Sequence, residues 1–354
     1  MTSAMQRDTI DTLVAELFTA DAASHPDGSI GAELELIPVR VRGHARVGIA
    51  DSAAGRGTAS IARAAAHVAG WSEETDPYGA PAWRTADGGR ICFEPGGQFE
   101  ICSPVCESPA ILHRFIASVV ALLRESAASE GVALLATGVD PYNAIEDVPV
   151  ELHAPRYDTM LRHFDSIGPS GARMMRQTAS LQVNVELGAD PLARWSLLNA
   201  LAPYLTAMYA NSPVYAGSAT GFASYRAHLW QTLDPSRTGI PFDAVDPVGR
   251  YAEFARGAYR MASDDRTHLS TLFPEVRPRR YFELRSMDAM EPDAAGEALH
   301  MLWSLIHGAD VSAELARVLG APDEELLHRA ARSGRRDRLL AERVAIIESL
   351  AARG

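Results

Sequence analysis

The 354-residue sequence lacks the features that mark membrane, secreted and nucleic-acid-binding proteins. Its apolar runs are far too short to span a bilayer. The stretch MTSAMQRDTIDTLVAELF has no basic start and no apolar core, so no signal peptide is expected. Only three cysteines occur (Cys92, Cys102 and Cys106), which excludes a disulfide framework and makes the reduced cytoplasm the default compartment. The formal net charge of −12 argues against a broad nucleic-acid or anionic-membrane surface.

Familiar catalytic motifs are also missing. No G-x-x-x-x-G-K-[ST] loop occurs, and no G-x-G-x-x-G follows a strand. Cys102 and Cys106 lack the second pair of ligands that a zinc site needs, and Cys92 and Cys102 are expected to be packing residues. Repeats and disordered linkers are absent, which predicts a single catalytic domain. It would span residues 1–354, with a core at 29–290 and a C-terminal helical segment at 291–354.

Hydrophobic periodicity and turn signals predict a mixed order of helices and strands. Helices are expected at residues 8–20, 58–69, 109–130, 156–164, 191–210, 222–232 and 247–260, with three or four more after Pro292. Strands are expected at residues 29–39, 132–139, 176–187 and 279–287, with a hairpin around Asp87-Gly88. Because the order lacks regular βαβ alternation, it favours an α+β fold on a largely antiparallel sheet.

The stretch GGRICFEPGGQFEICSP, residues 88–104, places two carboxylates in an otherwise apolar strand pattern. Side chains alternate between the two faces of a strand, so residues an even number apart share a face. The residues that share the polar face are Cys92, Glu94, Gln98, Glu100 and Cys102, provided that Pro95-Gly96-Gly97 does not shift the register. Two acids that point the same way repel each other unless a cation lies between them.

Three further strand predictions have a polar face rich in acids and amides. The members of these faces are Glu33 and Glu35; Thr178, Ser180, Gln182, Asn184 and Glu186; and Tyr281, Glu283 and Arg285. For any single strand, a sheet with one wet face is the ordinary explanation. Such a face would usually include lysine and mixed charge, whereas these strands carry mainly oxygen ligands and no lysine. Carboxylate and amide oxygens suit Mg²⁺ or Mn²⁺, and ions held on a sheet would bind a polyphosphate.

Six segments, taken together, resemble the ATP-dependent glutamate–cysteine ligases. The resemblance is to the branch that contains the plant and proteobacterial enzymes and the ligase that begins ergothioneine synthesis. In order, over about residues 30–290, the segments are GAELELIP, FEPGGQFEICSP, RMMRQTASLQVNVEL, ANSP, YRAHLWQTLDPSRTGIPF and HLSTLFPEVRPRRYFELRSMD. The family implies a fold similar to the catalytic domain of glutamine synthetase. In that fold a curved, mainly antiparallel sheet forms a funnel, with helices on its outer side.

The resemblance also implies an activity and a set of site residues. Glutamate would be activated as a γ-glutamyl phosphate and then attacked by the amine of cysteine. The funnel would hold ATP as a substrate with two or three Mg²⁺ ions, for which Mn²⁺ could substitute. The implied metal ligands are Glu33, Glu35, Glu94, Glu100 and Glu283. The other implied site residues are the catalytic cation Arg285, the nucleotide contacts Gln182 and Asn184, and the substrate contacts Arg226, Trp230 and Arg237.

One segment departs from the family pattern. Between the helix near Tyr259 and the run HLSTLFPEV, only MASDDRT joins the chain, where the family has a considerably longer connection on the substrate side of the pocket. The acceptor therefore stays open between cysteine and a different amine. A phosphotransferase and a non-catalytic binding relative are competing functions, although all five implied carboxylates are present. The expected partners are small molecules, with neither nucleic acid nor membrane among them, and the oligomeric state is unassigned.

Overall fold

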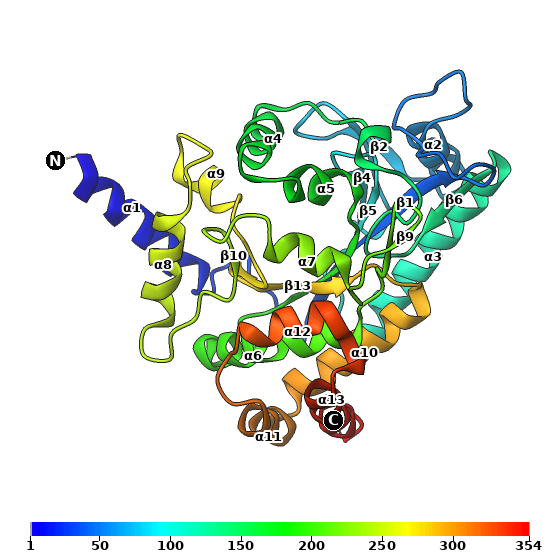
Figure 1. The fold of residues 1–354 in the computed structure, drawn as a ribbon. Helices are drawn as coiled ribbons and strands as arrows, with labels where there is room; N and C mark the ends of the chain where they lie inside the picture. The colour runs from blue at the N-terminus through cyan, green and yellow to red at the C-terminus, as the bar shows by residue number, and fades with distance from the viewer. Residues whose placement is uncertain (1, 354) are drawn as a thin grey trace.

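The computed structural model describes residues 2–353 and has one large sheet with helices packed around it (Figure 1). Within those residues the sheet has nine strands, in the order β12-β13-β7-β1-β5-β4-β3-β2, with β6 also paired to β1. All of these pairings are antiparallel. The strands are β1 (Ile30–Arg40), β2 (Ser72–Thr75), β3 (Pro81–Arg84), β4 (Arg90–Phe93), β5 (Phe99–Cys102), β6 (Val132–Leu135), β7 (Ser180–Val185), β12 (Val276–Pro278) and β13 (Phe282–Asp288). The predicted α+β class on a mainly antiparallel sheet is confirmed.

Two small strand pairs lie apart from the large sheet. They are the antiparallel pair of β8 (Val214–Tyr215) with β9 (Ser218–Ala219), and the parallel pair of β10 (Thr238–Gly239) with β11 (Phe273–Pro274). The second pair joins the segment after α7 to the segment before β12, and Phe273 of β11 lines the site described below.

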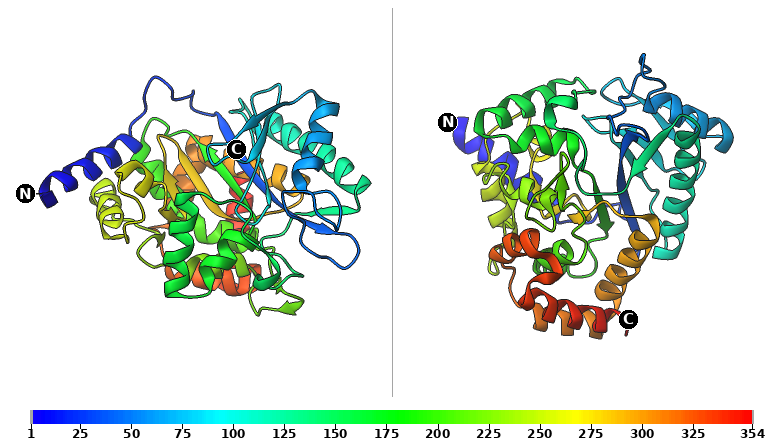
Figure 2. Two further views of the ribbon diagram at one scale, coloured as in Figure 1. Left: turned by 90° about the horizontal axis from the view of Figure 1, so that it is seen from above. Right: turned by 45° about the vertical axis from the view of Figure 1, so that its right-hand side comes forward.

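Helices cover both sides of the sheet. They are α1 (Thr2–Leu17), α2 (Thr58–Ala69), α3 (Pro109–Ser129), α4 (Pro155–Ile167), α5 (Ser170–Gln177), α6 (Pro191–Met208), α7 (Tyr225–Gln231), α8 (Pro247–Gly257), α9 (Asp265–Leu269), α10 (Pro292–His307), α11 (Ala309–Leu319), α12 (Glu325–Ser333) and α13 (Arg338–Ala351), with 3-10 turns η1 (Ile145–Asp147) and η2 (Gly334–Arg336). Figure 2 shows α3 and α4 on opposite sides of β1.

The apolar face of the sheet packs against α3, α6 and α10 and forms the main core. Leu34, Phe99 and Phe282 from three strands are fully buried there. The C-terminal helices α11–α13 pack against α6 and α10, at the bottom of Figure 1, and Ile347 of α13 belongs to the same core cluster. A second, smaller apolar cluster is formed largely by residues of α4 and α5, Met174 among them, on the polar side of the sheet.

Most helix limits follow the sequence signals. Helix α3 begins after Ser108, whose side chain accepts a hydrogen bond from the backbone N–H of Ile111, and it ends before Gly131, whose φ is +64°. The Asp87-Gly88 turn joins β3 to β4 as predicted. The prediction was wrong for residues 176–179, because Arg176 and Gln177 end α5 and the strand begins only at Ser180.

Among the residues that the structure describes, no helix is both long and apolar enough to cross a membrane.

Candidate active site

The polar face of the sheet forms one wall of a cavity of about 380 Å³. Helices α4, α5 and α7 contribute the residues of the facing wall. The acidic and amide side chains that line it are Glu33, Glu35, Asp76, Glu94, Gln98, Glu100 and Gln182. The arginines that line it are Arg90, Arg156, Arg226, Arg277, Arg279 and Arg285. Most of the expected site residues therefore meet in one place, although they come from distant segments.

The hairpin of β4 and β5 keeps both of its acids on the cavity side. Cys92 lies opposite Glu100 and Phe93 lies opposite Phe99. The backbone N–H of Glu94 donates to the carbonyl of Gln98 at 2.9 Å, and Gly97 donates to the carbonyl of Glu94 at 2.8 Å. The Pro-Gly-Gly turn therefore closes the hairpin without a register shift, and the alternation expected from the sequence holds.

The turn needs its glycines for space and for conformation. A Cβ on Gly96 would lie 2.1 Å from the carbonyl oxygen of Arg176, and Gly97 has a φ of +77°. The buried Arg46 guanidinium donates to the carbonyls of Gly96 and Arg176 and pairs with Asp140 at 3.1 Å. Sequence reasoning missed Arg46, because it lies in a loop with no pattern that links it to the hairpin.

Three carboxylates gather into a group that we call the acid cluster: Glu35, Glu94 and Glu100. Each offers an oxygen, and these atoms lie within 4.8 Å of one another. Burial, followed by repulsion from Glu100, raises the pKa of Glu35 to about 7. Burial and the carboxylates of Glu100 and Glu283 raise the pKa of Glu33 to about 8, and the pKa of Glu94 is raised well above its ordinary value by burial and Glu100. The charged forms of these groups are therefore destabilised.

The acid cluster fits a hard divalent cation. Its donors are carboxylate oxygens, which Mg²⁺ and Mn²⁺ prefer. A cation placed among them would replace the mutual repulsion of the acids with attraction. Two hydrogen bonds hold Glu35 in place: one from the backbone N–H of Ser180 at 2.8 Å and one from the Gln182 amide at 3.3 Å. Glu35, Glu94 and Glu100 would hold such an ion, with Glu33 beside them.

Glu283 has different neighbours from the other acids. It is fully buried, and its two carboxylate oxygens accept hydrogen bonds from Arg277, Arg279 and Arg285. Although burial alone would raise its pKa, these three arginines hold the pKa of Glu283 well below its ordinary value. In this arrangement Glu283 gathers the arginines, and binding a metal would require at least one of these pairs to separate.

Arg277 and Arg279 were missed at the sequence level, although a signal existed. They lie at even spacing from Glu283 and Arg285, so alternation continued two and four residues back from Tyr281 would have placed them on the same face. In the structure Arg277 lies on β12, directly opposite Glu283. The chain contains no lysine, so every basic side chain of this face is an arginine. Arginine presents a planar fork of donors that suits carboxylate and phosphate oxygens.

Arg285, Arg226 and Trp230 form one wall of the cavity. The Arg285 guanidinium lies 5.2 Å from the centre of the Trp230 ring and donates to the side-chain oxygen of Gln182. Arg226 donates to the backbone carbonyl of Arg285 at 2.8 Å and lies 3.8 Å from the buried Asp288. Arg226 and Arg285 are thus in contact with each other, and both guanidinium groups lie over the Trp230 ring.

The two expected nucleotide contacts lie on β7, the strand that pairs with β1 beside Glu33. Gln182 is opposite Glu33 in the β1–β7 pairing and lines the main cavity. Asn184 lies opposite Gly31 and lines a second cavity of about 410 Å³. Glu33 and Arg279 belong to the linings of both cavities. The second cavity therefore adjoins the first along the edge that Glu33 marks.

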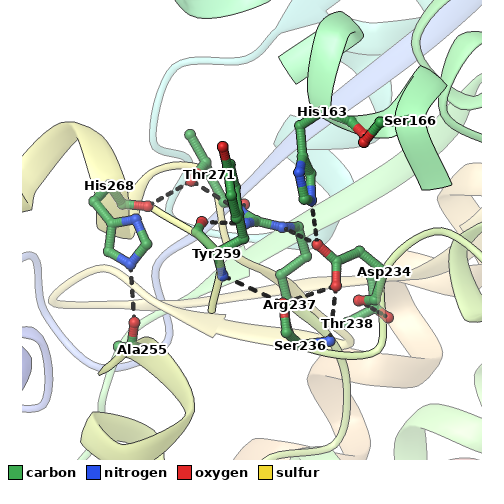
Figure 3. Close-up of polar contacts among 10 residues, drawn as sticks. All are labelled: His163, Ser166, Asp234, Ser236, Arg237, Thr238, Ala255, Tyr259, His268 and Thr271. Atoms are coloured by element: carbon green, nitrogen blue, oxygen red, sulfur yellow. Dashed lines mark hydrogen bonds and ion pairs between the residues drawn. The ribbon is translucent and has the colours of Figure 1, made fainter. Parts of the chain in front are cut away.

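Arg237 does not line either of these cavities. It is fully buried, and its guanidinium donates to Asp234, to the carbonyl and hydroxyl of Thr271 and to the carbonyl of Tyr259, as Figure 3 shows. His163 contacts Asp234 at 2.8 Å and stacks on the Tyr259 ring. The structure thus gives Arg237 internal partners in place of the expected substrate contact.

These contacts hold both ends of the short connection noted in the sequence. Tyr259 lies just before it and Thr271 lies just after it, and one guanidinium binds both. Burial would raise the pKa of Asp234, but hydrogen bonds from Arg237, His163 and Ser236 lower it to about 2. Asp234 therefore stays ionised beside Arg237 across the neutral range.

An arginine-rich recess of about 310 Å³ lies beside this connection. We call it the arginine recess, and its basic residues are Arg156, Arg266, Arg277, Arg279 and Arg280. Arg156, Arg277 and Arg279 also line the main cavity. Apolar side chains, among them Leu13 and Leu269, complete the recess. It combines cations and apolar surface at the edge of the site.

Comparisons with known proteins show the family to which this chain belongs. The model of Glutamate-cysteine ligase family 2 (GCS2) matches residues 29–351. The "Glutamate--cysteine ligase EgtA" of Mycolicibacterium smegmatis is 33% identical over 293 residues, which cover 72% of this chain and 68% of that protein. The chloroplastic glutamate–cysteine ligase of Arabidopsis thaliana is 34% identical over 239 residues, which cover 56% of this chain and 45% of that protein. The match thus spans less than half of the plant protein.

The solved structures that match this chain are more distant in sequence. A bifunctional glutathione synthetase from Pasteurella multocida is 15% identical, with a TM-score of 0.48, covering 98% of this chain and 54% of that one. A glutamate–cysteine ligase from Francisella tularensis in complex with AMP is 10% identical, with a TM-score of 0.47, covering 93% of this chain and 82% of that one.

Proposed function

Because the chain belongs to the glutamate–cysteine ligase family 2, we propose that it uses ATP to join the γ-carboxylate of glutamate to an amine. The observation that carries the proposal is the single cavity that the acid cluster lines together with six arginines. A polyphosphate substrate suits this combination, because carboxylates can hold the divalent ions that bind its oxygens and arginines can bind its remaining charges. The arginines also suit the carboxylates of glutamate.

The reaction divides into two balanced steps. The glutamate γ-carboxylate takes the terminal phosphoryl group of ATP, which gives γ-glutamyl phosphate and ADP. The acceptor amine then attacks the acyl carbon, loses a proton and displaces phosphate. Bound Mg²⁺ would neutralise the phosphate oxygens during transfer. Such transfers depend on alignment and charge stabilisation more than on a protein nucleophile.

The side chains of this protein can be assigned to these needs. We assign Arg285 to the transferring phosphoryl group, because Glu283 and the Trp230 ring hold it against the acid side of the cavity. Arg226, which is fixed by the Arg285 carbonyl, is assigned to the glutamate carboxylate, with Trp230 as a wall. The nucleotide is assigned to the side of Glu33 where Gln182 and Asn184 lie. Arg237 is assigned a positioning role through Tyr259 and Thr271.

Cysteine is the first candidate for the acceptor, because the relatives are named glutamate–cysteine ligases. One observation favours a different amine as a second candidate. The arginine recess opens beside the main cavity through Arg156, Arg277 and Arg279. A recess with cations and apolar surface suits an amine that carries a carboxylate and a larger side chain than that of cysteine.

The test measures ADP and product mass with ATP, Mg²⁺ and glutamate, to which single amines are added. An amide product that requires glutamate supports the ligase, whereas a phosphorylated product without an amide would support the phosphotransferase. The acceptor is then decided by an equimolar competition among cysteine, serine, alanine, 2-aminobutyrate and larger amino acids. A pool composed almost entirely of γ-glutamylcysteine would rule out the second candidate, and a pool of glutamine from ammonia would contradict both.

A further inference from the structure

Two thiols flank one carboxylate of the acid cluster. Cys92 lies directly opposite Glu100 in the β4–β5 hairpin, and Cys102 lies opposite Arg90. Cys92, Glu100 and Cys102 therefore share the face that lines the main cavity. In the structure the thiol close to Cys102 is therefore that of Cys92. At the level of the sequence, Cys102 had been considered together with Cys106 as possible zinc ligands.

The three side chains converge on one point. One Sγ from each thiol and one Glu100 oxygen all lie within 4.8 Å of one another. The Cys92 thiol donates to Oε2 of Glu100 at 2.9 Å. Cys92 is buried, whereas Cys102 is partly exposed toward the cavity. An ion that entered the cavity would therefore reach the thiols from the Cys102 side.

We propose that Cys92, Cys102 and Glu100 bind a soft divalent cation such as Zn²⁺ or Cd²⁺. Two thiolates and one carboxylate bind Zn²⁺ or Cd²⁺ in preference to Mg²⁺. A water molecule would complete a tetrahedral shell. Binding releases the two thiol protons to solvent, so the two thiolates, the carboxylate and the divalent ion sum to one negative charge. Arg90, which lies opposite Cys102 and lines the same cavity, is placed to offset that charge.

A disulfide between these cysteines is the weaker interpretation of their approach. They occupy diagonal positions on neighbouring strands, because each has a different residue opposite it. Diagonal neighbours have Cα atoms roughly 7–8 Å apart. A disulfide usually requires a separation below about 6.8 Å. Thiols at this spacing are better suited to hold an ion between them than to bond to each other.

Glu100 belongs both to this site and to the acid cluster. A soft ion bound to the thiols would draw the Glu100 carboxylate away from Glu35 and Glu94. The site would therefore couple soft-metal binding to loss of the hard-metal site. This coupling depends on the proposed function, whereas soft-metal binding itself is independent of it.

The binding test uses the full-length, reduced, metal-free protein and Cd²⁺ as the probe. Thiolate coordination of Cd²⁺ gives an ultraviolet charge-transfer absorption, which we expect to saturate at one ion per chain. Cys92→Ser with Cys102→Ser should remove the absorption. It should also weaken Cd²⁺ binding by more than about 100-fold, beyond the 10–100-fold that loss of a supporting partner costs. Cys106→Ser is the matched control, because Cys106 is also buried but stands outside the cluster, and it should behave like the native protein.

Absorption that persists in the double variant, or that disappears with Cys106→Ser, would overturn the proposal. A second measurement needs no variant, in case the double variant folds poorly. Alkylation of Cys102, followed by peptide mass mapping, should be slowed by Zn²⁺ and unaffected by Mg²⁺ at the same concentration. Equal alkylation with and without Zn²⁺ would overturn the proposal. The coupling to the acid cluster is tested separately, by whether Zn²⁺ inhibits ligation in the native protein more strongly than in the double variant.

Discussion

Arg237 shows how a single residue can serve a site without lining it. Its donors bind Asp234, Thr271 and Tyr259, and its side chain is fully buried. We expect Arg237→Lys to lower the free energy of unfolding by about 3 kcal/mol, because lysine keeps the charge but leaves buried carbonyls without donors. Urea unfolding of the two proteins measures the difference.

The control for this substitution is Arg338→Lys, whose side chain is 93% exposed and pairs with Glu342 on its own helix. Its effect should stay within about 0.5 kcal/mol. Equal losses for the two variants would show that the Arg237 contacts contribute nothing specific.

Arg285 is the residue on which the proposed chemistry depends most. We expect Arg285→Lys to lower kcat by about 100-fold or more, because the planar fork that meets developing charge is lost. Steady-state kinetics with varied glutamate and ATP separates kcat from KM. An unchanged kcat with a raised KM for glutamate would make Arg285 a ground-state binding residue.

The raised pKa values of the site acids predict a pH effect on stability without metal. Glu33 and Glu35, with pKa values of about 8 and 7, bind more protons when folded than when unfolded. Stability from these groups is therefore present in acid and is lost as the pH rises toward 8. We expect the melting temperature in EDTA to fall between about pH 6 and 8, and Mg²⁺ to restore more of it at the higher pH.

Glu94→Gln provides the comparison for the pH effect, because it removes one carboxyl of the acid cluster. The variant should melt at a higher temperature than the native protein in EDTA at high pH and should respond less to Mg²⁺. If the native protein and the variant had the same pH dependence, the acid cluster would not be the source.

At the level of elements, the β4–β5 hairpin depends on its turn. We expect Gly96→Ala to move the turn away from Arg176, since the added Cβ would lie 2.1 Å from the backbone oxygen of Arg176. That oxygen belongs to the main chain, so it cannot move aside as the end of a flexible side chain could. Mg²⁺-dependent stabilisation should then weaken, because Glu94 adjoins the turn. Gly257→Ala is the control, because a Cβ there meets no atom of the described residues within 4 Å. Thermal shift with and without Mg²⁺ distinguishes the two, and an unaffected Gly96→Ala protein would contradict the prediction.

Alternation along the strands was enough to predict which faces carry the acids. Glu33, Glu94 and Glu100 needed only their own local sequence to be placed on polar faces, and the antiparallel pairing then brought them together. Arg46 could not be predicted in this way, because its contacts with Gly96 and Asp140 join a loop to distant segments. Helix α5 was missed because RMMRQ runs directly into a strand pattern, and its apolar partners, such as Phe164, lie on another helix.

At the scale of the whole molecule, the C-terminal helices share the main core. Ile347 of α13 is fully buried in that core, while its neighbour Ile346 is 40% exposed. We infer that residues 291–354 and the sheet form one cooperative unit. Ile347→Ala should lower stability by roughly 2–5 kcal/mol in a single transition seen equally by tryptophan fluorescence and far-ultraviolet circular dichroism.

Ile346→Ala has the same chemistry at an exposed position, so it should change stability by about 0.5 kcal/mol or less. Two separate transitions in the native protein, only one of which shifts in Ile347→Ala, would show that the C-terminal helices unfold independently of the sheet.

The Arg237 contacts also bear on how this family can diversify. One guanidinium holds Tyr259 and Thr271, the residues on both sides of the segment 260–270 that contains the short connection and α9. Because the residues at its two ends are fixed in this way, the length of the connection can change over evolution while the cavity wall stays in place. We expect that a longer segment grafted between Tyr259 and Thr271 would be accepted by the fold, which makes this position a natural one at which to reprogram the choice of acceptor.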